Sequence, residues 1–534
     1  MSSEPRDDGP SHGGRRSWII HPAIIAAYPI LALYAGNLGQ ITPAEIIRPL
    51  ALALAATCAV WLIVGLLTRS GHKGGLVASG AALAFFSYGH ARNLAPAAMH
   101  SWLAPLFVLA MATLAVWAWR RKGSMATLTS ALNLASIALV APSCWAIGAG
   151  ARPAPPRPPQ HARTIPTVPM GRVRPIPSAV AAVKPDVYYI VLDAYGRADA
   201  LRAYYGYDNE PFLRELEKRG FTITRESRAN YEQTPLCLAS AVNMEYLDDL
   251  AKRMGRTGTN MEPLRAMIDR SRVADELRAA GLKYIYIWTG GGQSRVETAD
   301  LVLDSDTGVS SFEGQVLGLS ALDASPGTSV GGFERHRAMV LAAFEHLESV
   351  AKLPYRKFVF AHIMAPHPPF TFMPDGSEVK TDRGYSADDG SRLLQGLSRE
   401  QYRQGYIDQL RYINKRTLEA IDQIIRQSKR PPVIILQGDH GSRMNLDWES
   451  LELTDVQEPY SILNAYRAPE AVRKYLYPSI SPVNTFRLVL TRLFGAHYPL
   501  LPDRSYYSTA NAPYGLTDVT GLLQAGKMPA PPGG

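Results

Sequence analysis

The spacing of apolar residues divides the chain into two unlike parts near residue 150. Before this point, five apolar stretches approach the ~20 residues that a bilayer-spanning helix needs. They run over about 18–37, 46–67, 75–90, 101–119 and 126–148. The third is the weakest, because it is short, rich in Ala and Gly, and interrupted by Ser79 and Ser87. The pattern predicts an N-terminal α-helical transmembrane bundle of about five helices over residues 1–150.

Basic residues beside these stretches predict how the bundle is oriented. Three inter-helix or leading segments carry most of them: Arg15 and Arg16, Arg69 and Lys73, and Arg120, Arg121 and Lys122. The alternate loops hold only Arg48 and Arg92. Because cytoplasmic loops are enriched in Lys and Arg, an inside N-terminus and five spans place everything after residue 150 outside. We therefore expect a multi-pass protein of a bacterial inner (cytoplasmic) membrane with an extracytoplasmic C-terminal domain.

Beyond residue 185, short apolar runs alternate with amphipathic segments. The runs at 186–195, 283–288, 357–364 and 432–439 are continuous, as in strands that are buried on both faces. Helical patterns lie between them, and two of these end in the glycines, Gly220 and Gly281, that often follow a helix. Alternating strands and helices predict an α/β domain over 185–534 with a mainly parallel sheet and helices on both faces.

Composition predicts a linker between the two parts and argues against nucleic acid as a partner. Residues 151–184 hold six Lys or Arg and no acid, and ten prolines fall within 151–185, so this segment reads as an extended linker. The rest of the chain holds 40 basic and 43 acidic residues, which places the net charge of +9 in the N-terminal part. A nearly neutral C-terminal domain argues against nucleic-acid binding.

Polar residues gather where three of the predicted strands end. Asp193 ends the first, His362 and His367 lie at and beyond the end of the third, and Asp439 and His440 end the fourth. A single acid or His at such a place is usually a turn, cap or structural residue. Ligands of parallel sheets bind outside the carboxyl ends of strands. Two carboxylates and an imidazole there suit one divalent metal, Zn²⁺ or Mn²⁺.

Thr234 is the candidate nucleophile, and it has a second interpretation. It precedes Pro235 and a helix-forming run, so the segment predicts a helix start with Thr as the N-cap. A hydroxyl at a helix N-terminus also lies where a phosphate or sulfate binds. If a metal binds this hydroxyl as well, it lowers the hydroxyl pKa and activates the oxygen for attack. The two interpretations stay open at this point.

Four segments, in this order, resemble the alkaline phosphatase/sulfatase superfamily. They are "YYIVLDAYGRADAL", "NYEQTPLCLASAVNMEYL", "HIMAPHPPF" and "QGDHGS". The chain is most similar to the membrane-anchored, sulfatase-like branch that includes lipoteichoic acid synthases and phosphoethanolamine transferases. The resemblance implies an alkaline phosphatase-like fold and a metal held by Asp193, Thr234, Asp439 and His440. It also implies Thr234 as the nucleophile and contact of His367 with the transferred group.

Some positions depart from this pattern or remain undecided. Formylglycine formation needs a Cys or Ser followed by x-Pro-x-Arg, whereas Cys237 is followed by Leu-Ala-Ser-Ala, which disfavours sulfate-ester hydrolysis. Arg197 either binds a phosphoryl oxygen or pairs with Asp199. A second metal would need further ligands, for which His362 and His367 are candidates. Ser240 is expected to pack inside the domain, and Arg443 is expected to be a solvated turn residue.

The sequence therefore predicts a membrane-anchored, metal-dependent phosphotransferase or phosphoric ester hydrolase. A phospho-threonine intermediate on Thr234 would be resolved by water or an acceptor hydroxyl. Membrane lipids and lipid-linked or glycan substrates of the envelope are the expected partners. The alternatives are a sulfuric ester hydrolase and a non-catalytic envelope-assembly protein that keeps the fold.

Overall fold

We describe the protein from a computed structural model, which divides into two compact units. The described residues are 18–36, 38, 43–95, 99–150, 184–290, 294–304, 311–324, 332–381 and 388–530. One unit comprises residues 1–156 and 315–326, and the other comprises 157–314 and 327–534. The linker predicted at 151–184 lies outside the described residues except for its last residue, Lys184.

The first unit contains a helix at each of the five predicted spans. The helices are α1 (His21–Gly36), α2 (Ile47–Thr68), α3 (Gly71–Leu94), α4 (His100–Arg120) and α5 (Ala126–Gly150). Three segments are long and apolar enough to cross a membrane: Pro43–Thr68, His100–Arg120 and Ala126–Ala149. Helix α1 is apolar but shorter. The N-terminal helical region is thus confirmed, and the number of five crossings stays a prediction.

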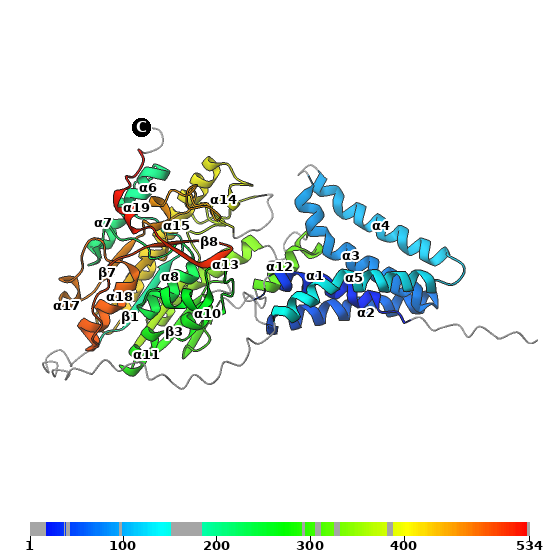
Figure 1. The fold of residues 1–534 in the computed structure, drawn as a ribbon, viewed down its shortest axis with the longest axis horizontal. Coiled ribbons are helices and arrows are strands. Elements are labelled where there is room, and N and C mark those ends of the chain that lie inside the picture. The colour runs from blue at the N-terminus through cyan, green and yellow to red at the C-terminus, as the bar shows by residue number, and fades with distance from the viewer. Residues whose placement is uncertain are drawn as a thin grey trace, which may run out of the picture. The chain divides into compact units, whose positions relative to one another are not determined.

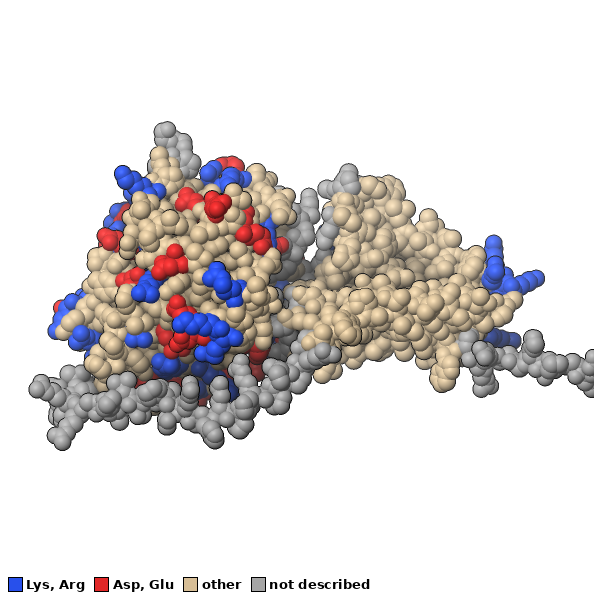
Figure 2. Space-filling view, viewed as in Figure 1, with Lys and Arg blue, Asp and Glu red and all other residues tan. Residues whose placement is uncertain are grey.

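Helix α3 uses small residues to pack against its neighbours α1, α2 and α4. Ala78 and Ala82 are buried, and a Cβ on Gly74 would lie 2.6 Å from the carbonyl oxygen of Trp61 on α2. Small residues let membrane helices approach closely, which accounts for the low hydropathy of this stretch. The visible surface of the bundle is uncharged apart from Lys and Arg gathered at one end (Figure 2).

A segment from far along the chain completes the first unit. Helix α12 (Ser311–Gly318) leads into the short helix η4 (Ala321–Ala324), which packs against α3. The backbone N–H of Gly89 donates to the carbonyl oxygen of Leu319 at 3.1 Å. A Cβ on Gly89 would collide with the carbonyl oxygen of Gly318, so only glycine permits this approach.

The second unit is built on a mostly parallel seven-stranded sheet in the order β2-β7-β6-β1-β5-β3-β4. The strands are β1 (Val187–Leu192), β2 (Thr222–Ile223), β3 (Lys283–Trp288), β4 (Leu301–Asp304), β5 (Lys357–Ile363), β6 (Val433–Gly438) and β7 (Asn464–Arg467). The four predicted strands are β1, β3, β5 and β6, and they are parallel neighbours at the centre. The sequence patterns missed β2, β4 and β7, which are short strands toward the two edges.

Helices cover both faces of this sheet, as predicted (Figure 1). One core joins it to α6 (Ala198–Tyr205), α7 (Glu210–Lys218), α13 (Gly332–Val350) and α15 (Arg399–Gln427). The other joins it to α8 (Thr234–Asn243), α10 (Glu262–Asp269), α11 (Arg272–Ala279) and α18 (Pro482–Val489). Tyr188 and Ile190 of β1 face the first core and Tyr189 and Val191 the second, because side chains alternate along a strand.

Shorter elements complete the unit. They are α9 (Asp248–Met254), α14 (Gly390–Leu393), α16 (Gln457–Tyr460), α17 (Glu470–Arg473), η5 (Leu490–Phe494), α19 (Thr520–Ala525) and the hairpin β8 (Tyr506–Thr509) and β9 (Ala512–Asp518). Two connecting segments of this unit supply side chains to the site described next: the residues that lead into α14 and the loop that follows β6. The fold class is therefore a helical N-terminal region followed by an α/β domain.

Candidate metal centre and nucleophile

The register of the sheet brings the two predicted carboxylates together. Leu192, the last residue of β1, pairs with Gly438, the last residue of β6. Because the strands are parallel, the next residues of each chain segment, Asp193 and Asp439, leave the sheet side by side. Both strands are buried along their whole length, and the two carboxylates come directly after them, at the carboxyl edge. This is the edge at which parallel sheets bind ligands.

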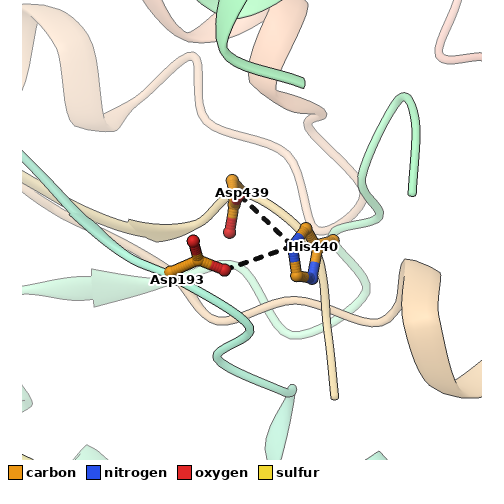
Figure 3. A group of neighbouring side chains, drawn as sticks. All are labelled: Asp193, Asp439 and His440. Carbon is orange, nitrogen blue, oxygen red and sulfur yellow. Dashed lines mark ion pairs between the residues drawn. The ribbon is translucent and has the colours of Figure 1, made fainter. Parts of the chain in front are cut away.

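Asp193, Asp439 and His440 form a buried cluster whose ligand atoms all lie within 4.8 Å of one another. Nε2 of His440 is 3.2 Å from Oδ1 of Asp193 and 3.4 Å from Oδ2 of Asp439 (Figure 3). Nδ1 of His440 lies 2.9 Å from the carbonyl oxygen of Gly441, so this nitrogen carries the ring proton. The lone pair of Nε2 is then turned toward two carboxylates, as in a metal-binding histidine.

The cluster fits a divalent cation. Oδ1 of Asp193 and Oδ2 of Asp439 are buried and accept no hydrogen bond from the described part of the chain. Burying a carboxylate oxygen without a donor is costly, and a cation would satisfy both oxygens at once. A set of two carboxylates and one imidazole suits Zn²⁺ or Mn²⁺. The residues present therefore match the predicted metal site in composition and burial.

Thr234 lies at the same place and faces the cluster. Helix α8 begins at Thr234 and its N-cap is Gln233, so Thr234 belongs to the first turn and is not the cap. Its hydroxyl oxygen is 3.1 Å from Nε2 of His440. Thr234 is partly exposed, whereas the three candidate ligands are buried.

The histidines around Asp193 keep its carboxylate ionised. Burial raises the pKa of Asp193, but His367, His362 and His440 outweigh it and hold that pKa well below its ordinary value. Burial and Arg443 lower the pKa of His440, whereas Asp439 and Asp193 outweigh them and raise it. An ionised Asp193 beside an imidazole is the state that binds a cation.

His367 and Arg443 form a second group beside the metal cluster. Arg443 was predicted to be a solvated turn residue, and this is wrong, because only 3% of it is exposed. Its Nη2 lies 2.7 Å from Nε2 of His367, and its Nε donates to Oδ2 of Asp389 at 3.0 Å. Sequence reasoning missed Asp389 altogether, since "ADDGSR" carries no motif and no strand precedes it. Only the tertiary fold brings this carboxylate to the site.

The other predicted residues are placed as follows. Arg197 forms a two-bond pair with Asp199, at 2.7 and 2.8 Å, and donates to the carbonyl oxygen of Ser227. Of the two interpretations of Arg197, the structure therefore displays the Arg–Asp pair. Nε2 of His362 is 3.2 Å from Oδ2 of Asp193, where it supports the carboxylate from the side away from His440.

The thiol of Cys237 and the hydroxyl of Ser240, also on α8, are engaged in hydrogen bonds to the backbone. Cys237 is buried, its thiol donates to the carbonyl oxygen of Tyr231, and burial raises its pKa well above the ordinary value. Ser240 donates to the carbonyl oxygen of Glu245 at 2.7 Å, and it packs inside the domain as expected. Of the two hydroxyl groups of helix α8, that of Thr234 lies beside the cluster.

Comparisons with known proteins find similar solved structures but no similar sequence. No protein-family model matches the chain, and no curated protein matches it in sequence. The C-terminal periplasmic domain of EptC from Escherichia coli, in complex with Zn, matches with a TM-score of 0.42 and 10% identity over 66% of this chain and 97% of that one. The phosphoethanolamine transferase EptC domain from Campylobacter jejuni matches with a TM-score of 0.36 and 12% identity over 58% and 89%.

A hydrolase is also among the similar structures. The phosphonate monoester hydrolase of Agrobacterium radiobacter matches with a TM-score of 0.40 and 16% identity over 61% of this chain and 80% of that chain. These solved proteins belong to the alkaline phosphatase/sulfatase superfamily, the one that the sequence motifs resemble.

Proposed function

We propose that this protein is a membrane-anchored, metal-dependent phosphotransferase or phosphoric ester hydrolase that uses Thr234 as its nucleophile. The observation that carries the proposal is the position of the Thr234 hydroxyl, 3.1 Å from Nε2 of His440 in the Asp193, Asp439 and His440 cluster. Thr234 is partly exposed, whereas the three residues of the cluster are buried. Such an arrangement provides a fixed nucleophile at the surface of a preformed site.

One divalent cation, Zn²⁺ or Mn²⁺, would be held by Asp193, Thr234, Asp439 and His440. A bound cation of this kind lowers the pKa of a coordinated hydroxyl and stabilises negative charge on the reacting group. The protein itself orients the ligands: Gly441 fixes the tautomer of His440, and His362 supports Asp193. The N–H group of Ala194 donates to Oδ1 of Asp439 at 3.2 Å and fixes this carboxylate as well.

The proposed reaction has two transfers at one phosphorus atom. In the first, Oγ1 of Thr234 forms a bond to phosphorus and loses its proton, while the ester oxygen leaves on the opposite side and gains one. The product is a phospho-threonine at residue 234. In the second, the oxygen of water or of an acceptor hydroxyl attacks phosphorus and releases Thr234, which regains its proton. The position of Thr234 at the N-terminus of α8 favours this chemistry, because the positive end of the helix dipole attracts anions.

The membrane region points to the class of substrate. We propose that residues 1–150 anchor the protein in the inner membrane of a bacterial cell, 151–184 form a linker, and 185–534 form an extracytoplasmic catalytic domain. Three segments of the first part are long and apolar enough to cross a membrane. A catalytic domain tethered in this way would meet membrane lipids and lipid-linked or glycan acceptors of the envelope.

The two alternatives have less support. A formylglycine-dependent sulfatase would need a modifiable Cys or Ser at the nucleophile position, where this chain has Thr234 and buries Cys237. A non-catalytic protein would not need two buried, donor-free carboxylate oxygens beside the hydroxyl of Thr234. The phosphoryl-transfer interpretation uses all of these features.

Hydrolysis of a chromogenic aryl phosphodiester by the full chain in detergent tests the proposal. Wild type supplemented with Zn²⁺ or Mn²⁺ is expected to turn the ester over, and Thr234→Ala is expected to lose turnover while keeping its metal. Mass spectrometry of wild type quenched during turnover is expected to find the phosphoryl group on Thr234. Wild-type turnover by Thr234→Ala, or hydrolysis of sulfate esters alone, would contradict the proposal.

A further inference from the structure

The guanidinium of Arg443 is buried beside the metal cluster, and two of its N–H groups have no partner among the described residues. Three of its N–H groups are engaged: Nε donates to Asp389, Nη1 to the carbonyl oxygen of Glu232 at 2.9 Å, and Nη2 to His367. A guanidinium has five N–H groups. Each terminal nitrogen therefore retains one N–H that makes no hydrogen bond to the described part of the chain.

This guanidinium is held rigidly. Its carbon lies 4.9 Å from the ring centre of Trp448, which covers one face. Trp448 donates in turn to the backbone carbonyl oxygen of Asp389 at 2.7 Å, and the hydroxyl of Tyr402 donates to the carboxylate of Asp389. The group is thus fixed by packing and by hydrogen bonds before any ligand arrives, which is a property of preorganised binding sites.

The same contacts place Arg443 next to the reacting atoms. Glu232, whose carbonyl oxygen accepts from Nη1, is separated from Thr234 by a single residue. The ring of His367, whose Nε2 accepts from Nη2, has its centre 6.3 Å from that of His440. Arg443 therefore lies between the segment that carries the nucleophile and the loop that carries His367.

His367 has no ring donor left in this arrangement. Its Nδ1 lies 2.5 Å from the carbonyl oxygen of Pro368, and its Nε2 faces the donor Nη2 of Arg443. The resemblance assigns the contact with the transferred group to His367, but an anion needs donors, and the unused donors here belong to Arg443. A guanidinium also matches the geometry of phosphate oxygens through two parallel hydrogen bonds.

We propose that Arg443, held in place by Asp389, binds the charged oxygens of the phosphoryl group that Thr234 attacks. This inference rests on the proposed function and names the residue that recognises the transferred group. Arg443 would contact the substrate, and Asp389 is a positioning residue. Two buried N–H groups are costly when unpaired, and the phosphoryl oxygens would satisfy both. Negative charge that builds up on these oxygens in the transition state would meet a fixed donor pair.

Kinetics of the full chain in detergent test this inference, with an aryl phosphodiester as substrate and inorganic phosphate as inhibitor. Arg443→Lys keeps the charge and loses the planar fork. It is expected to lower kcat/KM by about 100- to 1,000-fold, the loss that follows removal of a single transition-state donor. The inhibition constant of phosphate should rise at least about tenfold, with unchanged metal content. Guanidinium ions added to Arg443→Ala should restore part of the activity.

Arg219→Lys is the matched control. Arg219 lies outside the site and makes two hydrogen bonds to Asp422, at 2.8 and 2.9 Å. Its replacement should leave kcat/KM and the inhibition constant of phosphate unchanged. Arg443→Lys with wild-type kcat/KM and wild-type phosphate inhibition would overturn the inference. So would Arg443→Ala that keeps its metal and melting temperature, has lost activity, and gains none from guanidinium. Wild type that neither hydrolyses esters nor binds phosphate would remove the proposed function itself, a different outcome.

Discussion

Oγ1 of Thr234 lies 3.1 Å from Nε2 of His440, although the two residues are 206 positions apart along the chain. Thr234 begins helix α8, and His440 follows strand β6 in the centre of the sheet. The contact brings the candidate nucleophile to the candidate ligands, and the predictions that concern catalysis depend on it.

Removing Thr234 should separate catalysis from stability. Thr234→Ala is expected to lower turnover by several orders of magnitude, because the nucleophile and its ligands act as a unit. Thr234 is not the N-cap of α8, so the free energy of unfolding should fall by no more than the ~1 kcal/mol typical of a lost cap. Thr234→Ser should keep part of the activity. Phosphodiester hydrolysis and circular dichroism melts measure the two effects, and a folded Thr234→Ala enzyme with wild-type turnover would exclude Thr234.

The metal site can be tested without any substrate. Purified wild type should bind about one equivalent of Zn²⁺ or Mn²⁺, a number that follows from one set of ligands. Asp439→Ala and His440→Ala should each lose this metal, since each removes one of the three buried ligands, all of which Thr234→Ala retains. His497→Ala, which changes an exposed histidine outside the cluster, is the control. Elemental analysis that finds undiminished metal in both ligand variants would refute the site.

The pair of Asp389 and Arg443 should make stability depend on pH. Burial raises the pKa of Asp389, but the charge of Arg443 outweighs it and holds the pKa below its ordinary value. A depressed carboxyl pKa adds stability above the unfolded-state pKa, and this stability is lost as the pH falls through the folded-state pKa. Asp389→Asn leaves Arg443 buried without its charged partner. This should lower the free energy of unfolding by about 3–5 kcal/mol at neutral pH.

The difference in the free energy of unfolding between wild type and Asp389→Asn should therefore become smaller at low pH, because wild type also loses the charge of Asp389 there. Urea unfolding of both proteins at pH 7 and near pH 3 measures it. A difference that stays constant, or that grows as the pH falls, would contradict the ion pair. Asp422→Asn, which breaks the more exposed pair with Arg219, should cost only about 1 kcal/mol or less at neutral pH.

The orientation of the membrane region gives a prediction that is independent of the site. Fusion of alkaline phosphatase after residue 160 should give an active enzyme, and fusion of green fluorescent protein there should not fluoresce. The reason is the distribution of Lys and Arg, which favours a cytoplasmic N-terminus and an odd number of crossings. Fusions after residue 70 should behave in the opposite way. Cytoplasmic fluorescence of the fusion at 160 would mean that the number of crossings is even.

Apolar patterning alone determined the main features of the fold. Helices occupy all five apolar stretches of the N-terminal region, and the four continuous apolar runs are the four central parallel strands. Burial on both faces leaves a strand little choice but an unbroken apolar run, so such strands are visible in sequence. The short strands toward the sheet edges escaped prediction, as Leu301–Asp304 shows: it is only partly buried and bonds to a single neighbouring strand.

The residues of the site also divide into those that the sequence indicates and those that only the tertiary structure places. Asp193, Asp439 and His440 could be selected from sequence because each directly follows a recognisable strand, and parallel strands end at one edge. Arg443 and Asp389 could not, since their roles depend on a contact across 54 residues between a loop and the start of a short helix. Local sequence does not encode such contacts. Only the tertiary fold decided that Arg443 is buried against Asp389 and that Thr234 faces His440, because packing of distant segments excludes water and sets both geometries.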